Sequence, residues 1–390
     1  MMQLRGRHYL SKQLCDFRLA DGLIQEVCSP TKSEKIVGGE DYWVCPGLID
    51  IQVNGYKGHD LYSDLTVDDV VAVAEELAEA GVTGFCPTVT TGGHATMKSS
   101  LETIAAARRG SPVAHGAIVG IHLEGPYISP EDGPRGAHPA QHVRKPDWEE
   151  LMTFQEAAQG GIRYITLAPD QPGALAFISR AVRAGIVVGI GHHSASAEQI
   201  ADAVAVGATV ATHLGNGTHD KLPRHDNYLW HQLAEDGLVA SLIMDGYHLP
   251  PPVVKCFFRV KGVHKLVLVS DVIALAGLAP GRYTLMGEDV ELVEEGPARL
   301  WDTPYLAGST LKLSDGINNV MDYAEASFCE AVQMASLNPA CLLGVDRERG
   351  TLRPGSRADL TLFRRRRNAY QLALTIAGGE IRYRSSSFSV

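Results

Sequence analysis

The sequence has no long hydrophobic run, because no segment approaches the roughly 18 apolar residues that a membrane-spanning helix needs. Residues 1–7, Met-Met-Gln-Leu-Arg-Gly-Arg, lack the apolar core of a signal peptide. Basic residues are outnumbered, with 35 Lys and Arg against 45 Asp and Glu. These absences predict a cytoplasmic protein with no membrane and no nucleic-acid partner. The one basic run, Arg364 to Arg367, fits a solvated turn between two strands.

Cysteine is sparse as well. The 7 cysteines are scattered, form no CxxC pair and are odd in number. Such a set predicts free thiols in a reducing compartment. Repeats, linkers and low-complexity tracts are also lacking. The chain does have size, since 390 residues of which 45% are hydrophobic can bury a sizeable core and predict more than one domain.

The middle of the chain contains eight short apolar runs with helix-like segments between most of them. The runs are rich in Val, Ile and Leu, as is typical of parallel strands covered on both faces. Strands that alternate with helices in this way predict an α/β fold, a (β/α)₈ TIM-like barrel. The runs are 48–54, 83–89, 117–124, 163–168, 186–192, 209–214, 239–245 and 266–271, and the helix-like segments include 67–80, 97–109, 148–159, 174–184 and 197–206.

The two ends of the chain share a different pattern, with short alternating segments broken by Gly and Pro. We expect residues 1–46 and 352–390 to pair into one small β-sandwich domain, which leaves 47–351 for the catalytic barrel. Within the barrel, Pro87 suits only a strand end. Residues 282–305 predict an inserted hairpin, and helices follow from Asp315 to Ser336.

Several apolar runs end in a carboxylate or an imidazole. Glu124, His192 and His213 are good ligands for one divalent transition metal, with open positions left for water. His122 lies on the same strand face as Glu124 and is expected either to orient a ligand or to pack. His193 follows His192 directly, so either histidine could be the ligand.

Two further strand ends carry chemistry. Asp271 ends Leu266-Val-Leu-Val-Ser-Asp and could act as a general base and then a general acid, or it could be a capping aspartate. His248 could contact substrate, or it could be an exposed loop residue. On the first strand, Gln52 and Asn54 share a face; neutral amides are poor ligands for a transition metal, so this strand offers no second metal site.

An ordered set of motifs covers nearly the whole chain and resembles the N-acetylglucosamine-6-phosphate deacetylase family of the amidohydrolase superfamily. The matching segments are Pro46-Gly-Leu-Ile-Asp-Ile-Gln-Val-Asn-Gly, His122-Leu-Glu-Gly-Pro, Gly136-Ala-His-Pro, Thr166-Leu-Ala-Pro, Gly191-His, Thr212-His-Leu-Gly-Asn, Asp245-Gly-Tyr-His, Val269-Ser-Asp, Gly308-Ser-Thr, Asn338-Pro-Ala and Gly355-Ser-Arg-Ala-Asp-Leu.

The resemblance implies the roles of individual residues. It assigns the metal to Glu124, His192 and His213, the base to Asp271, and oxyanion stabilisation at the acetamide carbonyl to His138. The implied substrate-binding residues are Gln52, His138, Asn216, Gly217, Arg224 and His248.

The same resemblance implies a reaction and an assembly. It indicates hydrolysis of N-acetylglucosamine-6-phosphate to glucosamine-6-phosphate and acetate, with one divalent metal per subunit, foremost Zn²⁺ with Fe²⁺, Mn²⁺ or Co²⁺ as alternatives. It also implies a homodimer in which Arg224 could reach the partner's site.

The segment after His213 departs from the family's usual Asn-Ala-Met type. Asp220 and Asp226 flank Arg224, and carboxylates near a phosphate pocket weaken dianion binding. A deacetylase for the galacto isomer or for an unphosphorylated sugar is therefore the nearest alternative. An amidohydrolase for cyclic amides or dipeptides is less well supported, because strand four lacks a lysine. A non-catalytic sugar-phosphate binder would have lost ligands that are present here.

Overall fold

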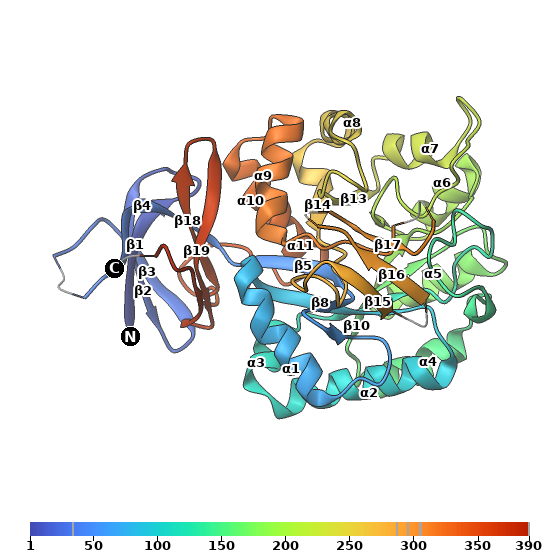
Figure 1. The fold of residues 1–390 in the computed structure, drawn as a ribbon, viewed down its shortest axis with the longest axis horizontal. Helices are drawn as coiled ribbons and strands as arrows, with labels where there is room; N and C mark the ends of the chain where they lie inside the picture. Colours follow the sequence, from blue (N-terminus) through green and yellow to red (C-terminus); the bar gives the residue numbers. More distant parts are fainter. Residues whose placement is uncertain (33–34, 286–287, 295, 304–305, 389–390) are drawn as a thin grey trace.

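Eight parallel strands form the centre of the computed structural model, which describes residues 1–32, 35–285, 288–294, 296–303 and 306–388 (Figure 1). Neighbouring strands follow the chain order, and the first and last meet where Val53 bridges Val272. The predicted (β/α)₈ barrel is therefore confirmed. Its strands are β5 (Leu48–Val53), β8 (Val82–Thr90), β9 (Ile121–Glu124), β10 (Ile162–Leu167), β11 (Val187–Ile190), β12 (Val210–Ala211), β13 (Val239–Ile243) and β14 (Leu266–Val269).

Helices cover the outside of these strands. Capping boxes at Thr66, Ser196 and Ser327 start three of them, each cap stabilising its helix by about 1 kcal/mol. The α-helices are α1 (Val67–Glu76), α2 (His94–Gly110), α3 (Pro112–Ala117), α4 (Trp148–Ala157), α5 (Ala174–Arg183), α6 (Ala197–Ala205), α7 (Tyr228–Ala234), α8 (Pro251–Lys261), α9 (Leu313–Ala324), α10 (Phe328–Ala335) and α11 (Leu337–Leu342); the 3₁₀ turns are η1 (Leu77–Ala80), η2 (Ala140–His142) and η3 (Val263–Lys265).

Both ends of the chain contribute to a separate seven-stranded sheet beside the barrel (Figure 1). In it β4 pairs parallel with β1 and antiparallel with β18, so the two ends meet at one strand. The small β unit expected from both termini is thus present as one continuous sheet. Its order is β20 (Glu380–Arg384), β19 (Ala369–Ala377), β18 (Leu360–Arg366), β4 (Val37–Pro46), β1 (Met2–His8), β2 (Leu14–Ala20) and β3 (Leu23–Cys28).

Some sequence predictions about single elements were wrong. Pro87 lies inside β8, where its missing N–H does no harm because β8 pairs with β5 up to Pro87 and with β9 only from Thr88. The third strand begins at Ile121, since Ala117 still belongs to α3. Arg364 to Arg366 end β18, so only Arg367 of that run lies in the turn.

The insertion after β14 was predicted as a hairpin, but it forms three antiparallel strands. They are β15 (Gly281–Leu285), β16 (Glu288–Leu292) and β17 (Ala298–Leu300), and residues 286–287, 295 and 304–305 of the predicted hairpin lie outside the described part. A second short pair, β6 (Gly55–Tyr56) and β7 (His59–Asp60), follows the first barrel strand. Within the described residues, no helix is both long and apolar enough to cross a bilayer.

Candidate metal centre and active site

Three predicted ligands meet at the carboxyl ends of the barrel strands. Glu124 is the last residue of β9, while His192 and His213 stand two residues beyond β11 and β12. The Nε2 atoms of His192 and His213 lie 3.2 and 3.0 Å from Oε1 of Glu124, and 3.1 Å from each other. All three side chains are buried. Among the described residues this is the one cluster of three or more such side chains that could hold a metal ion.

The donor set fits a divalent transition metal. Ligand atoms about 2.05 Å from a tetrahedral Zn²⁺ lie about 3.3 Å apart, close to the separations found here. Nδ1–H of His192 donates to the Pro134 carbonyl at 2.8 Å, which leaves Nε2 with the lone pair that a metal needs. Burial alone would raise the pKa of Glu124, but the hydrogen bonds and charges of the two histidines hold it well below its usual range.

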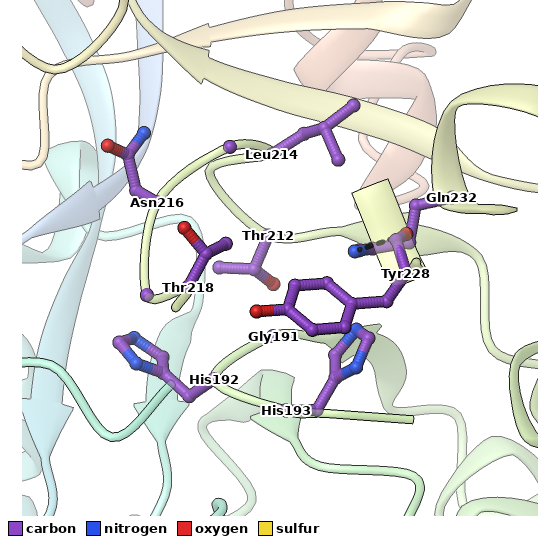
Figure 2. Close-up of a pocket in the computed structure, with 11 residues that line it drawn as sticks. Gly191, His192, His193, Thr212, Leu214, Asn216, Thr218, Tyr228 and Gln232 are labelled. Atoms are coloured by element: carbon purple, nitrogen blue, oxygen red, sulfur yellow. Dashed lines mark hydrogen bonds between the residues drawn. The ribbon is translucent and has the colours of Figure 1, made fainter. Parts of the chain in front are cut away.

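The His193 ring points away from the His192 ring, although the two residues are neighbours in sequence (Figure 2). Its Nδ1 accepts the Ala195 N–H at 3.1 Å, and its ring packs edge-on against Tyr228 with centroids 5.5 Å apart. Burial lowers the pKa of His193 to about 4, so the ring is neutral near pH 7. Of the two histidines, the structure therefore brings His192 to Glu124.

The backbone at the strand ends is unusual. His192, His213 and Asp271 adopt φ values of +53°, +31° and +50°, in the left-handed region that non-glycine residues rarely occupy. Such strain collects at functional sites, where surrounding packing holds it. Gly217, with φ +59°, lets the next loop approach closely, because a Cβ there would lie 2.7 Å from Nδ1 of His192.

Asp271 lies beside the triad, at the end of the last barrel strand. Its Oδ1 accepts a hydrogen bond of 2.7 Å from Nδ2 of Asn54. Burial and the nearby charge of Glu124 raise the pKa of Asp271 to about 6. A carboxyl group with this pKa can both take and return a proton near neutral pH.

The first strand supports the site. Nε2 of Gln52 donates to Oε1 of Glu124 at 2.9 Å, so the structure places this predicted substrate-binding side chain against the carboxylate of the candidate metal cluster. His122 lies deeper in the barrel. Its Nε2 is 2.8 Å from the Thr166 hydroxyl and its ring stacks on Tyr164, a packing and hydrogen-bonding role in the barrel interior.

Other predicted residues surround the triad. The His138 ring meets His192 edge-on with centroids 4.4 Å apart, and burial lowers the pKa of His138 to about 3. Its buried Nδ1 has no hydrogen-bond partner among the described residues. Asn216 donates its Nδ2–H to the His213 carbonyl at 3.2 Å. Asn216 and His192 also line one small cavity, together with Gly191, His193, Thr212, Leu214, Gly215, Gly217, Thr218, Tyr228 and Gln232 (Figure 2).

The last two predicted substrate-binding residues, His248 and Arg224, differ in their exposure to solvent. His248 donates its Nδ1–H to Asp245 at 2.6 Å, and no described residue bonds its Nε2. The charge of His248 lowers the pKa of Asp271, so the two side chains lie near each other. Arg224 is exposed, on the loop before α7, and the structure does not bring it to the triad within this chain.

Two contacts near the site were not predicted from the sequence. The first is the contact between Asp245 and His248. Asp245 stands three residues before His248 in the sequence, and this short spacing could have indicated the contact. The second is a contact of 3.2 Å between Nε2 of His219 and the Glu131 carboxylate, which joins the loop after β12 to the loop after β9. Nothing in the separation of these two residues along the chain points to their pairing.

The barrel, the buried Glu-His-His cluster and the nearby Asp271 define the class of metal-dependent amide hydrolases. A family model described as the amidohydrolase family matches residues 43–382. The chain is 31% identical to N-acetylglucosamine-6-phosphate deacetylase of Bacillus subtilis (strain 168), over 90% of this chain and 87% of that protein. It is 33% identical to N-acetylgalactosamine-6-phosphate deacetylase of Escherichia coli O157:H7, over 92% and 93%.

A solved structure shares the fold throughout. It is a mutant of N-acetyl-D-glucosamine-6-phosphate deacetylase from Mycobacterium smegmatis in complex with N-acetyl-D-glucosamine-6-phosphate. The TM-score is 0.87 at 27% sequence identity, covering 98% of this chain and 99% of that one. The chain thus belongs to the N-acetylglucosamine-6-phosphate deacetylase family of amidohydrolases, as the motifs predicted.

Proposed function

We propose that this protein hydrolyses the acetamide bond of N-acetylglucosamine-6-phosphate, which yields glucosamine-6-phosphate and acetate. The observation that carries the proposal is the convergence of Glu124, His192 and His213 beside Asp271 at one end of the barrel. Relatives that match most of the chain carry this activity by name.

Each site residue has one task in this reaction. A divalent metal held by Glu124, His192 and His213 would polarise the acetamide carbonyl and lower the pKa of water. Asp271 takes a proton from the attacking water as the new C–O bond forms. It then gives this proton to the departing nitrogen as the C–N bond breaks, so that acetate and the amine leave. His138, neutral and buried, donates a hydrogen bond to the oxygen on which negative charge develops.

The phosphate needs cationic partners. His248 stands near Asp271, and no described residue bonds its Nε2, so we assign this nitrogen to the phosphate together with the backbone N–H of Gly217 and the second Nδ2–H of Asn216. Arg224 is exposed in the single chain, so we propose a homodimer in which this arginine serves the partner's site.

The galacto isomer is the second candidate substrate, because an N-acetylgalactosamine-6-phosphate deacetylase is 33% identical over 92% of the chain. An unphosphorylated sugar is a further alternative. Two carboxylates on the loops before α7 and after β9 support this alternative, because negative charge near a phosphate weakens its binding. Asp226 lies 2.9 Å from His231, and Glu131 lies 3.2 Å from His219.

Three broader assignments complete the proposal. We propose Zn²⁺ as the metal, with Fe²⁺, Mn²⁺ or Co²⁺ as alternatives, because one carboxylate and two imidazoles suit all of them. We propose a cytoplasmic location, which fits the free state of all cysteines. We also propose two domains, 1–46 with 352–390 and 47–351, which fit the division between the seven-stranded sheet and the barrel.

The test is acetate release by the metal-loaded protein from four sugars in parallel: N-acetylglucosamine-6-phosphate, its galacto isomer, and both unphosphorylated forms. A strong preference for the gluco 6-phosphate supports the proposal. Turnover of only the other sugars would overturn the substrate and keep the deacetylase chemistry. No acetate from any of them would overturn the deacetylase assignment.

A further inference from the structure

The first barrel strand places three polar side chains at alternate positions, Asp50, Gln52 and Asn54, which therefore share one face. Asp50 and Gln52 are each only 1% exposed. Burying polar groups at the centre of a barrel costs free energy unless each has a use. The contacts of these three side chains show what that use is.

The two amides serve different carboxylates. Gln52 donates to Oε1 of Glu124 at 2.9 Å, and Asn54 donates to Oδ1 of Asp271 at 2.7 Å. Glu124 belongs to the metal triad, whereas Asp271 is the proposed base. One strand thus contacts both carboxylates of the site, and each amide holds only one of them.

We propose that Asn54 is a positioning residue for Asp271, and Gln52 one for Glu124, so that one strand orients the base and the metal ligand independently. The role of Asp271 as the base rests on the proposed function. Because the Asn54 bond occupies Oδ1, and no described residue donates to Oδ2, Oδ2 is the atom left to take the proton. A carboxylate fixed at one oxygen presents the other in a set direction.

Asp50 anchors this arrangement. Its Oδ1 lies 3.3 Å from the backbone N of Gln52 and 3.3 Å from that of Ser270, the residue before Asp271. These contacts join the first strand to the last near the Val53–Val272 bridge. The strand that carries both amides is thereby fixed to the strand that carries the base.

The charges around Asp271 set the expected effect of losing Asn54. The titratable groups around Asp271 are Glu124 and Asp50, which raise its pKa when ionised, and His213 and His248, which lower it when protonated. The Asn54 bond favours the ionised form of Asp271. Without it, the acid limb of the pH–rate profile should move to higher pH.

The experiment compares Asn54→Ala with Gln52→Ala in the full-length protein. For N54A we expect kcat to fall about 10–100-fold, with an upward shift of the acid limb and metal affinity within about twofold of the parent. For Q52A we expect Zn²⁺ affinity, measured by chelator competition, to fall about 10–100-fold, with the acid limb in place at saturating metal.

A matched control variant tests whether loss of any hydrogen-bonded amide side chain has the same effect. Asn318→Ala removes an amide side chain that hydrogen-bonds to neither carboxylate. It donates to the Tyr370 carbonyl at 2.9 Å and accepts the Tyr370 N–H at 2.8 Å, between α9 and β19, so its loss should leave kcat and metal affinity unchanged. If N54A is not folded by circular dichroism, Asn54→Ser replaces it. An N54A enzyme with the parent kcat and pH profile, or one that loses metal as severely as Q52A, would overturn the proposal.

The readouts also separate this proposal from the proposed function. Zn²⁺ affinity is measured without substrate. If the parent protein deacetylates none of the sugars, the proposed function fails, yet loss of metal affinity in Q52A but not in N54A would still support separate roles for the two amides. Equal losses would count against them.

Discussion

Asp271→Asn offers the most informative single substitution, because it should remove activity and yet stabilise the metal-free protein. Asparagine keeps an oxygen that can accept the Asn54 hydrogen bond, and it tolerates the left-handed backbone of φ +50° at least as well as aspartate. The substitution therefore changes mainly the charge. Without a group to take the water proton, kcat should fall by about 10²–10⁴-fold.

The stability effect follows from the pKa. Burial and Glu124 raise the pKa of Asp271 from 3.8 to about 6, so the folded protein binds this proton more tightly than the unfolded chain does. The charged carboxylate then costs stability above pH 6, and the cost disappears as the pH falls below 3.8. The difference between a pKa of 3.8 and one of about 6 corresponds to about 3 kcal/mol at most, since a tenfold change in proton affinity is worth about 1.4 kcal/mol.

The assay is thermal unfolding of both proteins with a chelator present, across the range from about pH 4 to about pH 8. The variant should melt about 3–6 °C higher than the parent at the alkaline end, and this difference should shrink toward the acidic end. A difference independent of pH, or a variant less stable than the parent at high pH, would refute the assigned pKa. Parent-like turnover by the variant would remove Asp271 from the role of base.

The remaining predictions concern the metal, the close loop, the pH profile and the phosphate. Glu124→Ala should lower metal affinity by more than about 100-fold, measured by metal analysis after dialysis, and unchanged content would refute the ligand assignment. Gly217→Ala should lower metal affinity, because the added Cβ would clash with His192. The control Gly185→Ala, which is also at positive φ but has open space around it, should leave metal affinity unchanged. Equal losses in both variants would attribute the effect to backbone strain alone. The acid limb of kcat/KM should lie at or below about pH 6, because Asp271 must be ionised and a bound cation lowers its pKa further; a limb well above this would contradict the base assignment. Arg224→Ala should raise KM for the phosphorylated sugar about tenfold or more and leave that for the unphosphorylated sugar unchanged, and equal KM changes would exclude a phosphate contact.

The sequence predicted the barrel because its signals are local. The apolar runs are short and most of them are followed by a segment with helical periodicity, so the alternation is visible without long-range information. Details that depend on neighbouring strands were missed. Pro87 is tolerated inside β8 because the ladder changes partner at that residue, and no local pattern reveals such a change.

The same division holds for the candidate site. Parallel barrel strands all end on one side, so the residue types at those ends by themselves indicate that Glu124, His192 and His213 meet. Whether His192 or His193 faces the metal was left open, because the backbone at positive φ and the bond to the Pro134 carbonyl decide it. The Pro134 carbonyl belongs to a loop 58 residues away in sequence.

The sequence by itself determined the order of strands and helices, and which chemical groups stand at the strand ends, because these follow from local periodicity and chain order. Only the tertiary structure decided which atoms pair. The bond from Asn54 to Asp271 joins residues 217 positions apart and exists because the barrel closes its first strand onto its last. The raised pKa of Asp271 depends on that closure too, since burial and the charge of Glu124 act only once the strands are assembled.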